Sequence, residues 1–229
     1  MSDVVTERQP ITVVLIRHGR STANASGILA GRMPGVALDA KGVEQSQSLI
    51  SALGETNIEF MVHSDLERTL STVRPLATHL QIPTIEDARI TECDYGDWSG
   101  RPLSELALEP LWTEIQKRPS QVTFPNGESM MAMQTRAVAC VRDYVGQAQR
   151  AFAMCSHGDV IKAIIADAVG LELDKFQSID VRPASISVLQ YDSSGGARLV
   201  MQNFPVGENA FGSLSLESTN SVGGGDVSA

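Results

Sequence analysis

Short apolar runs alternate with longer amphipathic segments along the chain. Residues 11–16, 58–62 and 151–155 are dominated by apolar side chains, which is typical of strands buried on both faces of a sheet. Residues 186–191 and 197–201 are predicted to be two closing strands. Apolar side chains at helical spacing predict helices over residues 41–53, 64–80, 128–148 and 159–170. This alternation favours an α/β fold, in which helices cover both faces of a mainly parallel central sheet.

Local signals define the expected helix ends. Ser64 and Glu67 match a capping box, in which the Ser64 side chain would cap the second helix. Asp159 is expected to cap the last helix, and Gly54 is placed to stop the first. Pro75 lies inside the second helix and is expected to kink or locally break it, because proline lacks the N–H of the helical ladder.

The domain organisation is predicted to be simple. Residues 1–205 are expected to form one domain, interrupted at about 95–127 by a stretch rich in glycine and proline that would contribute short helices and a side wall or lid. Residues 206–229 are rich in glycine, serine and acidic side chains and are expected to be a disordered tail.

Composition and charge narrow the functional classes. The chain has 18 lysines and arginines against 27 acidic residues, a net charge of −9, which argues against nucleic acid or an anionic membrane as partner. No apolar run approaches the roughly 20 residues of a membrane-spanning helix, and the first ten residues lack a signal core. Three cysteines do not form a disulfide framework. A cytoplasmic protein fits these observations best.

Three segments that follow predicted strands carry the candidate chemistry. They contain Arg17 and His18, then Arg68, then His157, and loops at the carboxyl ends of parallel strands meet at one edge of a sheet. A neutral imidazole can attack an electrophile, and an arginine beside it matches phosphate oxygens. A cation such as Arg68 is unusual in the first turn of a helix, where the helix dipole favours negative charge. Its presence there favours a bound anion. Together these residues predict phosphoryl transfer through a phosphohistidine.

The same segments resemble the signatures of a known family, the histidine phosphatase superfamily in its phosphoglycerate mutase-like branch (branch 1). Five segments carry the resemblance in the family's order: Arg-His-Gly-Arg-Ser-Thr-Ala-Asn at 17–24, Ser-Asp-Leu-Glu-Arg-Thr at 64–69, Glu-Cys-Asp-Tyr-Gly-Asp-Trp-Ser-Gly at 92–100, Gly-Glu-Ser at 127–129 and Ser-His-Gly at 156–158. The resemblance covers about residues 11–203. It implies a three-layer sandwich and leaves monomer and homodimer both open.

The resemblance also implies a role for each catalytic candidate. His18 would be the nucleophile, and Arg17, Arg68 and His157 would surround the phosphoryl group. Glu92 would protonate the leaving oxygen and later deprotonate the attacking water, as a general acid and base. No metal or other cofactor is expected, since arginines supply the positive charge.

Further residues around this set have weaker assignments. Asn24, and with it Ser21, would add hydrogen bonds to the phosphoryl group by the same resemblance. For Glu128 and Ser129, helix capping and substrate contact are equally supported. Arg20 is expected to be a surface residue. Arg32 is likewise expected to lie at the surface. Tyr95 and Trp98 are expected to pack in the core rather than to line the pocket.

Four functions are weighed at this point. The favoured one is a metal-independent phosphomonoesterase acting on a small phosphorylated metabolite. A phosphoglycerate mutase or related phosphomutase would use the same site but needs extra cations, and the 95–127 stretch balances three basic residues against three glutamates. A non-catalytic phospho-ligand binding module is the second alternative. A third, a metallohydrolase with His18, His157 and Asp159 as ligands, lacks the usual ligand spacing.

Overall fold

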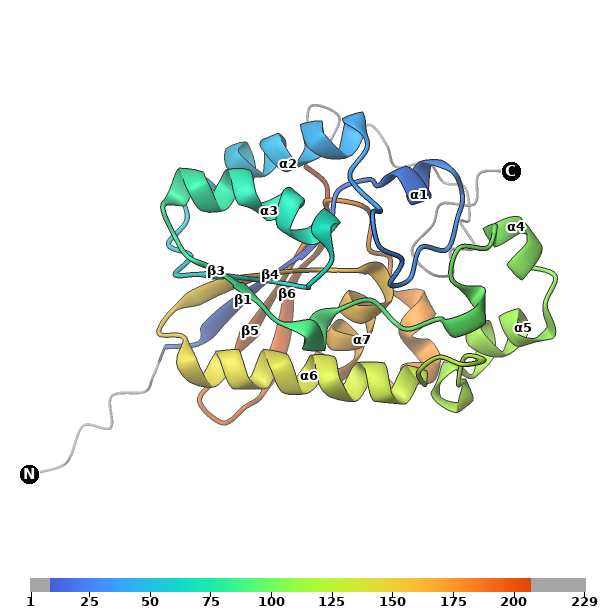
Figure 1. Ribbon diagram of the computed structural model, residues 1–229. Helices are drawn as coiled ribbons and strands as arrows, with labels where there is room; N and C mark the ends of the chain where they lie inside the picture. The colour runs from blue at the N-terminus through green and yellow to red at the C-terminus, as the bar shows by residue number, and fades with distance from the viewer. Residues whose placement is uncertain (1–8, 207–229) are drawn as a thin grey trace, which may run out of the picture.

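A computed structural model describes residues 9–206 and shows a six-stranded mixed sheet between two helical layers (Figure 1). The strand order is β3-β2-β4-β1-β5-β6. The pairs β1–β4, β4–β2 and β2–β3 are parallel, whereas β5 and β6 join by antiparallel pairing at the β1 side. The strand bounds are Ile11–Arg17 (β1), Met61–His63 (β2), Thr84–Glu86 (β3), Ala151–Ser156 (β4), Ile186–Tyr191 (β5) and Ala197–Phe204 (β6).

The two helical layers explain why the central strands are apolar along their whole length. Helices α2 (Ala40–Leu53) and α3 (Glu67–Leu80) cover one face, and α6 (Met130–Gln147) and α7 (Gly158–Ala168) cover the other (Figure 1). Along β1, Val14 and Ile16 pack in the cluster with α2 and α3, whereas Val13 and Leu15 pack in the opposite cluster with α6 and α7. Successive side chains of a strand point to opposite faces, so both faces of β1 must be apolar.

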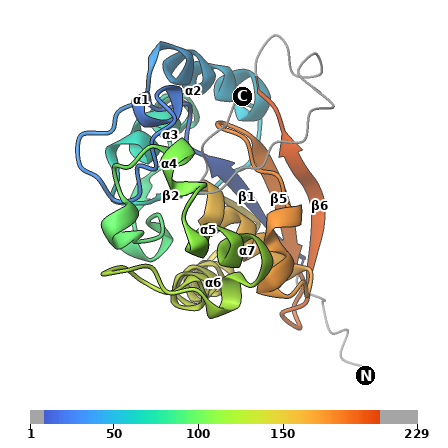
Figure 2. The ribbon, with the colours of Figure 1, turned by 90° about the vertical axis from the view of Figure 1, so that its right-hand side faces the viewer.

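Short helices gather at the edge of the sheet where the parallel strands end. These are α1 (Thr22–Ala25), α4 (Leu103–Leu106), α5 (Pro110–Lys117) and the 3-10 helices Ala88–Ile90, Gly96–Trp98, Pro119–Gln121 and Leu173–Ser178. Figure 2, which views the molecule from this side, shows α1, α4 and α5 in front of the sheet. The carboxyl edge of the sheet is thus enclosed by irregular chain.

The predicted fold class is confirmed, and the predicted central strands and long helices are present. Gly54 is the C-terminal cap of α2, as expected. The short edge strand β3 was not predicted, because its exposed Thr-Ile-Glu sequence has no apolar run. The predicted break at Pro75 is wrong in one respect, since α3 continues through it. The domain boundary at 205 stays a prediction, and all of the expected tail 206–229 except Val206 lies outside the described residues.

Two predicted helix caps are wrong. Helix α3 has Leu66 as its N-cap, without a side-chain hydrogen bond, so the predicted Ser64 capping box does not form. Helix α7 is capped by His157 rather than by Asp159, which lies inside the first turn and is buried. In both cases the polar side chain has a long-range partner that local sequence cannot reveal.

The loop after β1 is fixed against α2 by a close backbone approach. Gly42 of α2 faces the carbonyl of Arg20, and a Cβ on Gly42 would lie 2.0 Å from that oxygen. Asp39 caps α2 by accepting a hydrogen bond from Gly42 N–H, and it also forms an ion pair with Arg20 at 2.5 Å. The chain just after His18 is therefore held by contacts that leave no room for a side chain.

We expect Gly42→Ala to lower the free energy of unfolding by about 1–3 kcal/mol, because the new methyl group overlaps backbone. Gly146→Ala in α6 is the matched control, since a Cβ there meets nothing within 4 Å. It should raise that free energy by up to about 1 kcal/mol, the usual gain for alanine over glycine in a helix. Chemical denaturation measures both, and equal effects would contradict the packing account.

Candidate active site

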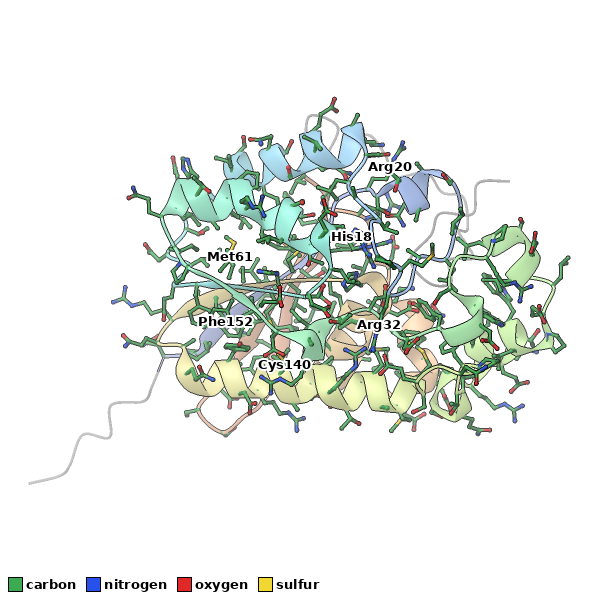
Figure 3. All side chains as sticks on the ribbon, viewed as in Figure 1. His18, Arg20, Arg32, Met61, Cys140 and Phe152 are labelled. Atoms are coloured by element: carbon green, nitrogen blue, oxygen red, sulfur yellow. The ribbon has the colours of Figure 1, made fainter. Side chains whose placement is uncertain are left out.

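The sheet order brings together the three segments that the sequence singled out. Strands β2, β4 and β1 are neighbours, with Arg17 opposite Ser156 and His63 opposite Cys155 in register. The main chain of His18 continues this pairing, as its N–H donates to Ser156 O at 3.0 Å. Figure 3 shows His18, Arg20 and Arg32 on the side of the sheet where β1 ends, well away from Met61 and Phe152.

His18 is held in one tautomer with one ring nitrogen free of a proton. Its Nδ1 lies 2.8 Å from the carbonyl of Gly19, and Arg68 Nε–H donates to its Nε2 at 3.4 Å. Because an arginine can only donate, Nε2 is the unprotonated nitrogen and Nδ1 carries the proton. Burial, reinforced by the charges of Arg68 and Arg17, lowers the pKa of His18 well below its usual value. The imidazole is therefore neutral, with a lone pair on Nε2.

Arg68 links the two histidines. Its side chain is 2% exposed, and its Nη2 donates to Gly31 O at 2.8 Å and to His157 Nδ1 at 3.3 Å. The His18 and His157 rings lie with centroids 5.1 Å apart. One buried guanidinium therefore faces both imidazoles, and its positive charge can attract an anion to this point.

Ser64 has a different role from the predicted one. Its Oγ lies 2.8 Å from His157 Nε2 and 3.0 Å from Thr69 Oγ1. Since Arg68 donates to Nδ1, His157 carries its proton on Nε2 and donates it to Ser64. Burial, with the charge of Arg68, lowers the pKa of His157 well below its usual value. Ser64 thus fixes the ring and tautomer of His157.

Arg17 is anchored at the end of β1. The side chain is 4% exposed, and its Nη1 donates to Val181 O at 2.6 Å. Its charge contributes to lowering the pKa values of both His18 and His157. The strand end therefore brings a second buried guanidinium close to the two histidines.

Glu92 lies in the same buried region and has an unusual proton affinity. Its side chain accepts a hydrogen bond from Cys93 N–H at 3.0 Å and is 4% exposed. Burial and then the negative charge of Asp159 raise the pKa of Glu92 to about 7, against the opposing charges of Arg68 and Arg17. A carboxyl group with this pKa can release and accept a proton near neutral pH.

Asp159 and Tyr95 form a buried pair beside Glu92. The Tyr95 hydroxyl donates to Asp159 Oδ2 at 2.8 Å, and both side chains are about 1% exposed. Asp159 was expected to be an N-cap, so its electrostatic effect on Glu92 was missed. Its position two residues after His157 was the one available signal. Tyr95 also packs edge-on against Phe124, which confirms its predicted place in the core.

Ser21 and Asn24 bond to each other at the start of α1. Asn24 N–H donates to Ser21 Oγ at 3.2 Å, and Ser21 N–H donates to Asn24 Oδ1 at 3.0 Å, which together form a capping box. The two residues follow His18 by three and six positions. Their contacts with a phosphoryl group stay a prediction.

The structure also bears on the metal alternative. Within the described residues, no group of three or more His, Cys, Asp or Glu side chains is arranged to hold a metal ion. His18, His157 and Asp159 therefore do not form the ligand set of a metallohydrolase there. Of the helices in the same range, none combines the length and apolar character that a membrane crossing requires.

Comparison with known proteins agrees with this geometry. The family model of the histidine phosphatase superfamily (branch 1) matches residues 13–204. The chain belongs to this superfamily. As a histidine phosphatase with relatives named as phosphatases, it is an enzyme of the phosphoric monoester hydrolase type that works through a phosphohistidine, and the predicted class is confirmed.

The relatives of this histidine phosphatase include both phosphatases and mutases. Phosphoserine phosphatase 1 of Hydrogenobacter thermophilus is 26% identical over 190 residues, which cover 80% of this chain and 87% of that protein. A probable phosphoglycerate mutase GpmB of Proteus mirabilis is 27% identical over 188 residues, 80% of this chain and 86% of that protein. The crystal structure of a putative α-ribazole-5'-P phosphatase from Escherichia coli aligns with a TM-score of 0.76 at 25% identity, and covers 86% of this chain and 98% of that one.

We expect Asp159→Asn to lower the pKa of Glu92 from about 7, because it removes the negative charge that disfavours the Glu92 carboxylate. NMR titration of the Glu92 side-chain carboxyl measures this directly. Asp167→Asn is the control, on the same helix but in an exposed ion pair with Arg142, and should leave the Glu92 midpoint in place. An unchanged midpoint in Asp159→Asn would mean that burial alone sets it.

Proposed function

We propose that this histidine phosphatase hydrolyses a small phosphomonoester, with His18 as the nucleophile. The observation that carries the proposal is the unprotonated Nε2 of His18, which faces a buried guanidinium, with His157 bonded to that same group. This arrangement supports attack on a phosphorus atom whose oxygens are held by the same cations.

In the first step, His18 Nε2 forms a bond to phosphorus as the ester oxygen leaves. Arg17 and Arg68 would neutralise the equatorial oxygens. Once the phosphoryl oxygens take the Arg68 N–H that His157 Nδ1 accepts in the free site, the dianion would favour a proton on Nδ1, from which His157 would donate a hydrogen bond as the charge develops. An alkoxide is a poor leaving group, so protonated Glu92 transfers its proton to the leaving oxygen, and the products are an alcohol and a phosphohistidine. The pKa of Glu92 at about 7 supports this step, because half of the groups carry the proton near neutral pH.

In the second step, water attacks the phosphohistidine. The Glu92 carboxylate takes a proton from the water as the oxygen bonds to phosphorus, and the His18–phosphorus bond breaks. Inorganic phosphate leaves, and Glu92 is again protonated for the next cycle. One carboxyl group thus acts in turn as acid and base.

Hydrolysis is favoured over mutase activity by the charges of the 95–127 stretch. A mutase must hold a bisphosphorylated intermediate, which calls for free cations in the 95–127 stretch. Arg101 is paired with Glu109 at 2.8 Å, and Arg118 with Glu114 at 2.7 Å. Lys117 is the remaining basic residue of that stretch, and it forms no ion pair with another described residue.

The substrate is proposed to be a small phosphorylated metabolite. The chain carries a net charge of −9 and offers little long-range attraction for an anion, so affinity would come from close contacts with buried arginines. The named phosphatases among the relatives act on small phosphorylated compounds, which supports this class. No role for nucleic acid or membrane is proposed, and the cytoplasmic location and the choice between monomer and homodimer stay predictions from the sequence.

A panel of phosphorylated metabolites and an aryl phosphate, assayed with wild type and His18→Ala, tests the proposal. Wild type should release inorganic phosphate, and His18→Ala should lose roughly 10³-fold or more in kcat because the covalent step is removed. The matched control His63→Ala replaces a buried histidine that bonds its own loop and should lose far less. Unchanged turnover in His18→Ala, or interconversion of 2- and 3-phosphoglycerate faster than any hydrolysis, would contradict it.

A further inference from the structure

The main chain of Glu92 is held by two arginines from distant parts of the sequence. Arg32 Nε donates to the Glu92 carbonyl at 2.9 Å, and Arg136 Nη2 donates to the same oxygen at 3.2 Å. Arg136 Nη1 also donates to Arg89 O at 2.7 Å, at the start of the same segment. Two cations therefore converge on the backbone of the residue proposed as general acid.

Glu128, from the Gly-Glu-Ser segment, is the carboxylate that holds both cations. Its Oε1 accepts from Arg136 Nη2 at 2.6 Å and from Arg32 Nη2 at 2.9 Å, and its Oε2 accepts from Arg136 Nε at 3.1 Å. Without this charge the two guanidinium groups would repel each other at one carbonyl oxygen. The side chains of Glu128 and Arg136 are 17% and 19% exposed, so solvent screens this repulsion only in part.

The backbone of Glu128 is joined to the same segment. Glu128 N–H donates to Asp94 O at 2.9 Å, and Asp94 N–H donates back to Glu128 Oε1 at 2.9 Å. From the other side, Ser156 Oγ donates to Ile90 O at 2.7 Å. The segment is thus fixed on both sides of Glu92, toward α6 and toward β4.

We propose that Glu128 is a positioning residue, which holds the Glu92 carboxyl group in place for proton transfer through Arg32 and Arg136. The inference rests on the proposed function of Glu92. The Glu92 carboxylate accepts its hydrogen bond from Cys93, the next residue of the same segment. A shift of this main chain therefore moves the carboxyl group with it, and a displacement of about 1 Å at a reacting group can cost 10²-fold in rate.

The leaving group of the substrate separates positioning of the acid from general stability. p-Nitrophenolate leaves without protonation, whereas an alkyl phosphate needs the Glu92 proton. In Glu128→Gln, kcat/KM for an alkyl phosphate should fall roughly 10- to 100-fold, while kcat/KM for p-nitrophenyl phosphate should fall less than about threefold, because kcat/KM reports the first step and not the hydrolysis of the phosphohistidine that both substrates share.

Glu114→Gln is the matched control, because it makes the same substitution in an exposed ion pair with Arg118; both rates should stay unchanged. Glu92→Gln serves as the reference for loss of the acid and should show the same selectivity more strongly. If Glu92→Gln lacks that selectivity, the proposed function of Glu92 fails, whatever Glu128→Gln does. If Glu92→Gln has it and Glu128→Gln does not, the positioning role fails alone.

A second variant tests the proposal in case Glu128→Gln does not fold. Arg32→Gln removes one of the two donors at the half-exposed side of the cluster and should show the same selectivity for alkyl phosphate at a smaller size, roughly 3- to 10-fold. Equal losses on both substrates in the folded variants, or no loss on either, would overturn the proposal.

Discussion

The buried guanidinium of Arg68 is the constraint on which the site depends. It is 2% exposed and is bonded to two imidazoles and one carbonyl oxygen, and among the described residues no carboxylate lies within ion-pair distance of it. A buried charge without a counterion is costly. The fold places this cation at the start of α3, where the helix dipole adds to the positive potential. A dianionic phosphoryl group is the ligand that would remove the cost.

The proton states of the other groups follow from this cation. Since Arg68 can only donate, it requires an unprotonated nitrogen on each histidine, and each ring must then carry its proton on the opposite nitrogen, toward Gly19 O or Ser64 Oγ. The same positive charges would lower the pKa of Glu92, but burial and Asp159 outweigh them. The site thus combines a neutral imidazole, the proposed nucleophile, with a carboxyl group whose pKa is raised to about 7.

The sequence predicted the parts of this site that are encoded locally. Buried strands followed by Arg17, His18 and His157 are visible as apolar runs with polar ends, and parallel pairing then brings these ends together. Ser64 and Asp159 could not be placed in the same way, because each also matches a local capping pattern. Their partners, His157 and Tyr95, lie 93 and 64 positions away along the chain.

The role of Glu128 shows the same limit. Its position before Ser129 at a helix start supported capping and substrate contact equally, and Ser129 does cap α6. The Glu128 carboxylate instead bonds Arg32, 96 positions away in the sequence. Nothing in the spacing of these residues indicates that they meet at the carbonyl of Glu92, because Arg32, Glu92 and Glu128 all lie outside helices and strands.

NMR of the trapped phosphoenzyme, with histidines labelled by ¹⁵N, tests the central claim most directly. The tautomer of His18 predicts that phosphorus is bonded to Nε2, while Nδ1 keeps its proton and its hydrogen bond to Gly19 O. Phosphorus bonded to Nδ1, or to a residue other than His18, would contradict the account.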